Sequence, residues 1–156
     1  MNDSVSNVSQ PMKVFISQPM NGRSDEVIKE EREEIIRVVK EYYGKIIGET
    51  DIEIIDSFFE DFNIDEGVGP IWYLGKSVMM MDKADVVVFA NNWSLARGCN
   101  FEHDIAVEYG KQVAFYWVMQ KQLSEQNLNE IASVLQDSED KSEKSEIVAC
   151  NPSETE

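Results

Sequence analysis

The fold is decided by two runs of sequence, Asp-Val-Val-Val-Phe-Ala at residues 85–90 and Ser-Leu-Ala-Arg-Gly-Cys-Asn-Phe-Glu-His-Asp-Ile-Ala-Val-Glu-Tyr-Gly-Lys at residues 94–111. The first run is short, apolar and β-branched, which is typical of a buried strand in a parallel sheet. In the second run Phe101, Ile105 and Tyr109 recur at helical spacing. The two runs therefore predict a strand, a polar loop and a helix in that order.

Strand and helix signals alternate along the rest of the chain. We expect strands at residues 13–17, 52–56, 85–90 and 112–117. We expect helices at residues 24–43 closed by Gly44, at 70–81 opened by Pro70, at 99–109 closed by Gly110, and around 123–135 on Leu123, Leu128, Ile131 and Leu135. This alternation predicts a parallel sheet with helices on both faces and right-handed crossovers.

The predicted strand order is 2-1-3-4, which places the switch point of the sheet between strands 1 and 3. Ligands of open α/β sheets bind at the carboxyl ends of the strands, at such a switch point. The loops at residues 17–23 and 91–98 follow strands 1 and 3, so we expect them to flank one cleft.

Length and composition predict one domain with short polar ends. The chain has 156 residues, enough for a single core, which we assign to residues 12–136. Residues 1–11 are polar and predict a flexible tail; residues 137–156 are rich in Ser, Glu and Lys and predict an acidic disordered tail. Residues 57–69 are too irregular to assign, and a lid or substrate loop is one interpretation.

The charge of the chain narrows the classes of partner. The net charge is −16, which argues against binding a nucleic-acid polymer or an anionic membrane, but not against a small anionic ligand. Two cysteines form no disulfide or metal framework. No metal site or organic cofactor is indicated by the sequence, and we expect neither. No signal peptide or membrane-length apolar run is visible, which predicts a cytoplasmic location.

The loop after the first strand has residues that suit an anion. Ser17, Gln18, Asn21, Gly22 and Arg23 precede a helix whose N-cap is Ser24, and backbone N–H groups at a helix start favour negative charge. Neither the Rossmann nor the P-loop glycine pattern is present. An ordinary turn between a strand and a helix is the alternative.

Glu102 is the sharpest catalytic candidate. It lies near a helix start after a buried strand, where a carboxylate either complements the helix dipole or attacks an anomeric carbon. Arg97 and Gly98 place a cation and a flexible backbone just before it. His103, the one histidine of the chain, faces a different way from its neighbour, so we expect it to pack or lie at the surface. Cys99 predicts a small buried side chain.

Several motifs together resemble the nucleoside 2-deoxyribosyltransferase-like superfamily, and its phage and bacterial DUF4406 branch above all. They are Val-Phe-Ile-Ser-Gln-Pro-Met-Asn-Gly-Arg at 14–23, Ala-Asp-Val-Val-Val-Phe at 84–89, Trp-Ser-x-x-x-Gly at 93–98, and Glu-x-x-x-Ala-x-x-x-Gly-Lys at 102–111. The resemblance covers about residues 12 to 118.

The resemblance implies a flavodoxin-like, Rossmann-like three-layer α/β sandwich with a four- or five-stranded parallel sheet, often assembled as a homo-oligomer. It implies cleavage of an N-glycosidic bond of a (deoxy)nucleoside or nucleotide, by hydrolysis or by deoxyribosyl transfer. Glu102 falls on the position of the family's nucleophile. The residues that would bind substrate are Ser17, Gln18, Met20, Asn21, Gly22, Arg23, Ser94, Arg97 and Gly98.

The chain departs from the active members of that superfamily in two places. Those members carry a tyrosine on the first strand, where this chain has Val14 and Phe15. They also carry an aspartate on the helix before the third strand, where this chain has Lys76 or Ser77. Tyr73 or Asp82 are candidate substitutes. These departures leave an enzyme and a nucleotide-binding or sequestering protein as open interpretations, with an interaction protein as a third that only the charge supports.

Overall fold

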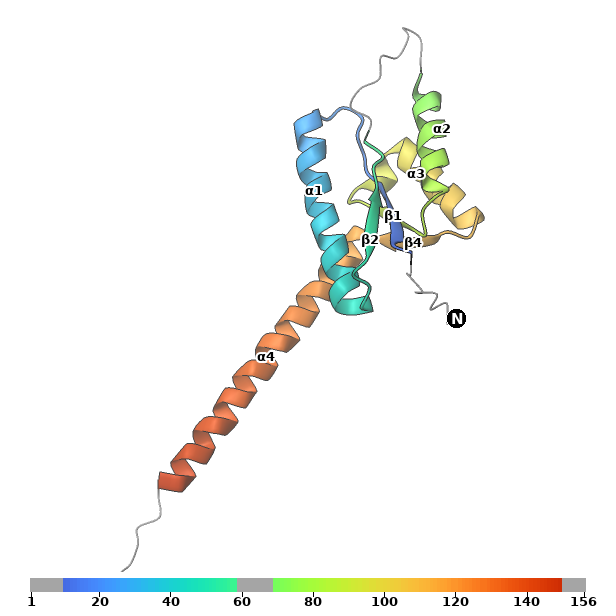
Figure 1. The fold of residues 1–156 in the computed structure, drawn as a ribbon. Helices are drawn as coiled ribbons and strands as arrows, with labels where there is room; N and C mark the ends of the chain where they lie inside the picture. Colours follow the sequence, from blue (N-terminus) through green and yellow to red (C-terminus); the bar gives the residue numbers. More distant parts are fainter. Residues whose placement is uncertain (1–9, 59–68, 150–156) are drawn as a thin grey trace, which may run out of the picture.

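The sheet has the predicted order. The computed structural model describes residues 10–58 and 69–149. Its strands are β1 (Met12–Ser17), β2 (Ile52–Ile55), β3 (Val86–Phe89) and β4 (Gln112–Phe115). Among the described residues they form a four-stranded, fully parallel sheet in the order β2-β1-β3-β4 (Figure 1). The predicted order 2-1-3-4 is therefore confirmed.

Helices cover both faces of this sheet. They are α1 (Asp25–Tyr42), α2 (Pro70–Met81), α3 (Arg97–Glu108) and α4 (Tyr116–Ala149), with a π-helical turn, η1 (Tyr43–Ile47), after α1 and a 3₁₀ turn, η2 (Trp93–Leu95), before α3. The cores of the two faces contain α1 and α4 on one side and α2 and α3 on the other. The fold is thus the expected flavodoxin-like three-layer α/β sandwich.

Strand alternation divides the core into two. One buried cluster lies toward α1 and α4, and it contains Val14, Ile16, Val86 and Val88 of the sheet together with Ile35 and Val39 of α1. The intervening residues Phe15, Val87 and Phe89 pack toward α2 and α3. Successive strand side chains point to opposite faces, so the all-apolar run 86–89 fills both cores at once. This alternation also decides where Ser17 points.

The predicted helix starts are largely confirmed. Ser24 caps α1 by accepting a hydrogen bond from the Val27 N–H at 3.4 Å, and Pro70 is the first residue of α2. Gly110 follows α3 with φ +69°, the left-handed conformation that glycine adopts without strain. The predicted start of α3 at residue 99 is two residues late, because the helix begins at Arg97.

The end of the first helix differs from the prediction. Gly44 does not end it, because the chain continues through the π-helical turn to Ile47. Gly48 ends it instead, with φ +82°, and the Gly48 N–H donates to the Tyr43 carbonyl. The extra turn buries Tyr43 at 3% exposure and brings Ile46 against the same core. Packing of these side chains outweighs the weak helix preference of Gly44.

The C-terminal part of the chain is more helical than the sequence predicts. The fourth strand ends at Phe115 rather than at 117, because Tyr116 and Trp117 already belong to α4. Residues 137–149 continue that helix, so the predicted disorder from residue 137 is wrong over this range. Glu, Lys and Gln are good helix formers, and they sustain a helix that extends far beyond the sheet (Figure 1).

Parts of three predicted segments lie outside the described residues. They are residues 1–9 of the N-terminal tail, residues 59–68 of the proposed lid, and residues 150–156 of the acidic tail. Within the described ranges, no helix is both long enough and apolar enough to cross a membrane.

Candidate active site

The carboxyl ends of β1 and β3 meet at the centre of the sheet. Ser17 and Phe89 are register partners in the parallel pair β1–β3. One residue further on, the Ala90 N–H donates to the Ser17 carbonyl at 2.9 Å. The loops that follow the two strands therefore start side by side at the switch point, as the strand order predicts.

Glu102 lies at this switch point with a serine on each carboxylate oxygen. The Ser17 hydroxyl donates to Glu102 Oε2 at 2.5 Å, and the Ser77 hydroxyl donates to Glu102 Oε1. The three residues come from β1, α2 and α3, so the contact ties three separate elements together. Glu102 is only 7% exposed, and both serines are buried.

The local sequence explains why these side chains converge. Ser17 continues the row of Phe15 on the face that packs against α2 and α3. Ser77 and Met81 are four residues apart on α2 and are both buried, which defines the face of α2 that meets the sheet. Cys99, Glu102 and Ala106 form the buried face of α3. Glu102 is the polar residue of that face.

Burial controls the protonation of this cluster. Removal from water raises the pKa of Glu102, and the hydrogen bonds from Ser17 and Ser77 act in the opposite direction by favouring the ionised form. Burial also raises the pKa of the Cys99 thiol to about 11, with Ser17 opposing the shift. Cys99 is therefore a buried thiol, as predicted, and Glu102 is the nucleophile candidate of the two.

The loop at residues 17–23 is organised around a second carboxylate. Glu31 Oε2 accepts hydrogen bonds from Gln18 Nε2 at 2.6 Å and from Arg23 Nη1 at 2.7 Å. Arg23 Nη1 also donates to the Pro19 carbonyl at 3.0 Å, and Gln18 Nε2 to the Ile28 carbonyl at 3.0 Å. The cation predicted to hold an anion is thus paired with Glu31, and an incoming anion must share or replace that partner.

The other residues predicted to bind substrate lie at the rim of the same edge. Met20 is half-buried, whereas Asn21 and Gly22 are exposed. Ser94 lies in η2, and its carbonyl accepts from Asn100 Nδ2 at 2.9 Å. Arg97 and Gly98 are the exposed first two residues of α3. The structure brings Ser17 into contact with Glu102 and leaves these rim side chains without a hydrogen bond to it among the described residues.

A family model for a domain of unknown function, DUF4406, matches residues 12–115. The chain belongs to this family. No curated protein and no solved structure matches it. The matched range contains β1, α2, β3 and α3, and hence Ser17, Ser77 and Glu102, whereas α4 begins directly after it.

Within this DUF4406 domain, Ser77 is the contact of Glu102 that the sequence did not assign. The resemblance gives it only as one of two residues, with Lys76, that could occupy the position of the superfamily's aspartate. The structure distinguishes the two, because Ser77 reaches Glu102 while Lys76 Nζ lies 5.3 Å from the centre of the Trp72 ring. The sequence shows only that Ser77 lies four residues before Met81, on the side of the helix that the structure shows to be buried.

A second polar cluster was also missed. Arg32 of α1 is 6% exposed, and its Nη2 donates to Ser57 Oγ at 3.0 Å and to the Ile55 carbonyl at 3.4 Å, just after β2. Ser57 in turn donates to the Ile16 carbonyl at 3.2 Å. Arg32 Nη1 and Gln18 Oε1 are buried without a hydrogen-bond partner in the part of the chain that is described. Burial lowers the pKa of the Arg32 guanidinium.

Aromatic residues pack between α3 and the strands β3 and β4. His103 stacks on Trp93 with ring centres 4.6 Å apart and an interplanar angle of 24°. Trp93 also stacks on Phe115 at 5.8 Å, and Phe89 meets Trp93 at 5.1 Å. The prediction that His103 packs rather than joins Glu102 is confirmed, and this cluster fixes the start of α3 against β3 and β4.

Proposed function

We propose that this protein cleaves the N-glycosidic bond of a (deoxy)nucleoside or nucleotide, with Glu102 as the nucleophile. The observation that carries the proposal is the buried Glu102 carboxylate at the β1–β3 switch point, bonded by Ser17 and Ser77. A carboxylate that is positioned from two sides can attack in a fixed direction, which lowers the entropic cost of reaching the transition state. The link to the nucleoside 2-deoxyribosyltransferase-like superfamily is part of this proposal.

The chemistry follows the double-displacement route of retaining glycosidases. A carboxylate oxygen of Glu102 bonds to C1′ of the sugar while the C1′–N bond breaks, and the electron pair of that bond leaves with the base. Water then attacks C1′ and releases Glu102, which gives hydrolysis; attack by a second base gives transfer. Ser17 and Ser77 favour the ionised form of Glu102 before attack, and one of them must release its oxygen for the new bond.

The leaving base needs a proton, and Tyr73 is the best placed donor. It lies four residues before Ser77 on α2, so it occupies the same side of the helix, and its side chain is half-exposed at 40%. Asp82, the other candidate, has an 86% exposed side chain and lies beyond the end of α2, 3.9 Å from Lys111. We therefore assign the proton donor to Tyr73.

The 17–23 loop supports an anionic substrate, most simply a nucleoside monophosphate. Gln18 and Arg23 already hold one carboxylate, that of Glu31, with short charge-assisted hydrogen bonds. A phosphate entering there offers the same donors more oxygens and a larger charge. Arg97 is a second cation near this site. It is the exposed first residue of α3 and belongs to the loop at residues 91–98, which follows β3.

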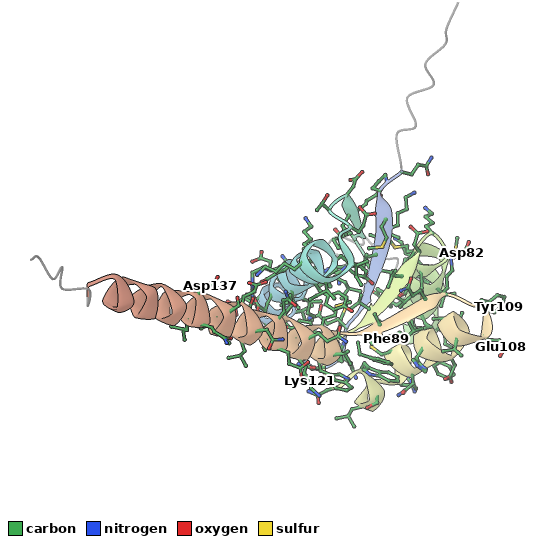
Figure 2. The ribbon with its side chains drawn as sticks, turned by 90° about the horizontal axis from the view of Figure 1, so that it is seen from below. Asp82, Phe89, Glu108, Tyr109, Lys121 and Asp137 are labelled. Atoms are coloured by element: carbon green, nitrogen blue, oxygen red, sulfur yellow. The ribbon has the colours of Figure 1, made fainter. Side chains whose placement is uncertain are left out.

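Base release tests the proposal. The purified protein is incubated with ribo- and deoxynucleosides and their monophosphates, and free base is followed by chromatography. We expect release from at least one monophosphate, abolished in Glu102→Gln and unchanged in Glu108→Gln, which makes the same chemical change on the exposed end of α3 (Figure 2). Equal release by wild type and Glu102→Gln would remove Glu102 from the role of nucleophile.

A binding protein without turnover is the second candidate. It is favoured by the hydrogen bonds on both Glu102 oxygens and by the burial of the side chain, which hold the carboxylate in contacts within the protein in this state. The same panel, followed by thermal shift, separates the two functions. A stabilising monophosphate that is never cleaved, in wild type or in any variant, would establish binding alone.

A further inference from the structure

Two buried polar atoms at the carboxyl edge of the sheet have no hydrogen-bond partner within the described parts of the chain. They are Nη1 of Arg32 and Oε1 of Gln18, and the two residues are 6% and 5% exposed. A donor and an acceptor that are withdrawn from water both destabilise the fold until a partner supplies the missing hydrogen bond. The two atoms therefore indicate a ligand group that accepts one hydrogen bond and donates another.

The two side chains belong to one polar network that joins α1 to the ends of β1 and β2. Gln18 Nε2 donates to the Ile28 carbonyl at 3.0 Å, one turn before Arg32 on the buried face of α1. Arg32 Nη2 donates to Ser57 Oγ at 3.0 Å, just after β2. Ser57 in turn donates to the Ile16 carbonyl at 3.2 Å, two residues before Gln18. The network lies where the loop from β1 crosses to the start of α1 (Figure 1).

Arg32 is a buried cation whose hydrogen-bond partners are neutral. In the described ranges its Nη2 donates to the Ser57 hydroxyl and to the Ile55 carbonyl. Burial lowers the pKa of the Arg32 guanidinium, and the charge of Asp56 opposes this shift. The Asp56 carboxylate is itself exposed and accepts from the Phe58 N–H at 3.0 Å. Since a buried charge is costly without an opposite charge in contact, Arg32 Nη1 favours a negatively charged acceptor.

The neighbouring cation, Arg23, already has a carboxylate. Arg23 Nη1 lies 2.7 Å from Glu31 Oε2, and the same oxygen accepts from Gln18 Nε2 at 2.6 Å. The side chains of Arg23 and Glu31 are 29% and 31% exposed, so this pair forms the outer side of the network. The Glu31 carboxylate thus shows how an oxyanion is held by Gln18 and Arg23, at the side from which one would enter.

The amide of Gln18 sets a condition on that oxyanion. Its Nε2 donates whereas its Oε1 accepts, so the side chain matches a group with one bare oxygen and one protonated oxygen. Sulfate and carboxylates carry no proton near neutral pH, and they would present only lone pairs to Oε1. A phosphomonoester has a second pKa of about 6, so it offers both P–O⁻ and P–OH in this range.

We propose that Arg32 and Gln18 bind a protonated phosphate group, and that Glu31 occupies part of this site until the phosphate enters. Arg32 Nη1 then donates to one phosphate oxygen, and the P–OH donates to Gln18 Oε1. Arg23 and Gln18 Nε2 exchange the Glu31 carboxylate for the remaining oxygens. Arg32 is thus a specificity-determining residue that holds the substrate by its phosphate, and the identity of that substrate rests on the function proposed above.

Calorimetric titration of the full chain with inorganic phosphate tests the site. Sulfate at equal ionic strength is the matched anion, because it has the same shape and lacks the proton. We expect phosphate to bind at least ~10-fold more tightly than sulfate. Equal affinities would show an adventitious ion only and would overturn the proposal. No binding at ~10 mM phosphate would also overturn it, and would leave a bridging water as the partner of the two atoms.

Removal of the competing carboxylate should strengthen binding, a result that a misfolded protein cannot imitate. We expect Glu31→Gln to bind phosphate about 10-fold more tightly than the wild type, because Arg23 and Gln18 no longer exchange an ionised partner. The control is Glu34→Gln, which removes the same charge from an exposed position of α1 and should bind as the wild type does. Unchanged or weaker binding by Glu31→Gln would contradict the proposal.

Arg32→Lys keeps the charge but loses the planar guanidinium fork, so phosphate should bind at least ~10-fold more weakly. Arg37→Lys makes the same change on the exposed side of α1 and should have no effect on binding. Circular dichroism checks that both variants keep their helix content. If Arg32→Lys binds phosphate as tightly as the wild type, Arg32 is excluded from the site; if it does not fold, Glu31→Gln decides.

Competition separates this site from the proposed reaction. In Glu102→Gln, a deoxynucleoside monophosphate should displace inorganic phosphate, and the corresponding nucleoside should not. Failure of every monophosphate to compete would overturn the assignment of the site to the substrate. Phosphate binding without base release by the wild type would refute the glycosidase and leave the site standing, whereas base release without phosphate binding would do the reverse.

Discussion

Replacing Ser77 with alanine removes one of the two donors that hold Glu102. Glu102 is 7% exposed, so water does not replace the lost hydroxyl at Oε1. A hydrogen bond to a charged group contributes about 1.5–3 kcal/mol, and a buried acceptor without a partner carries the full desolvation penalty. We therefore expect Ser77→Ala to lower the free energy of unfolding by about 2 kcal/mol at pH 8, which lowers Tm by roughly 4–8 °C in a domain of this size.

The loss of stability in Ser77→Ala should depend on pH. Ser77 favours the ionised form of Glu102, so its removal raises the pKa of that carboxyl further. At low pH the carboxyl is protonated in both proteins, and the two stabilities approach one another. Urea unfolding at pH 5 and pH 8 measures this dependence. The control is Ser133→Ala, because the Ser133 hydroxyl is exposed and donates to the Glu130 carbonyl of its own helix at 2.9 Å. A loss below about 0.5 kcal/mol at pH 8 would refute the reasoning.

Three further changes test other parts of the structure. Burial raises the pKa of Glu102 in the folded protein above its ordinary value of 4.5, so the wild type loses stability as the pH rises from that value through the raised pKa. Glu102→Gln lacks this titration, so its stability relative to the wild type should increase over the same pH range in urea unfolding. A difference that does not change with pH would contradict this prediction. Gly48→Ala should lower the free energy of unfolding by about 1 kcal/mol, because φ at Gly48 is +82°, whereas Gly44→Ala should not lower it. Chemical unfolding measures both, and equal losses would contradict the conclusion that Gly48 ends the helix. Asp85→Ala should cost about 1 kcal/mol and speed hydrogen exchange at the Lys13 amide, whose N–H donates to Asp85 Oδ2 at 2.8 Å; unchanged exchange would exclude this bond.

The layers and strand order could be predicted because they rest on local composition. The apolar, β-branched run 86–89 strongly favours a buried strand. Strands that are connected through helices pair in parallel, so the alternation of strands and helices predicts a parallel sheet. The boundaries at residues 43–47 and 116–117 could not, since tertiary packing decides them. Tyr116 and Trp117 have strand propensity, yet Tyr116 is buried in α4 against the α1 side of the core.

The position of Glu102 could be predicted, but its surroundings could not. Strand, loop and helix signals place it at the carboxyl edge of the sheet without any knowledge of distant residues. The contact with Ser77 joins residues 25 positions apart on two helices, and no local pattern encodes such a pairing. Arg32 was hidden for a similar reason: on α1 it reads as a solvated charge, and only the end of β2 shows that it is buried.

Ser17 and Gln18 show how one step along the chain divides the site between two carboxylates. Ser17 is the last residue of β1 and points with Phe15 toward Glu102, whereas Gln18 turns toward α1 and bonds Glu31. Adjacent extended residues must face opposite ways, so the chain itself separates the proposed nucleophile from the loop that is proposed to hold an anion. A sugar phosphate has the same two-ended chemistry, with an anomeric carbon at one end and a phosphate at the other. This division is the physical reason for favouring a nucleotide over an uncharged nucleoside as the substrate of the proposed reaction.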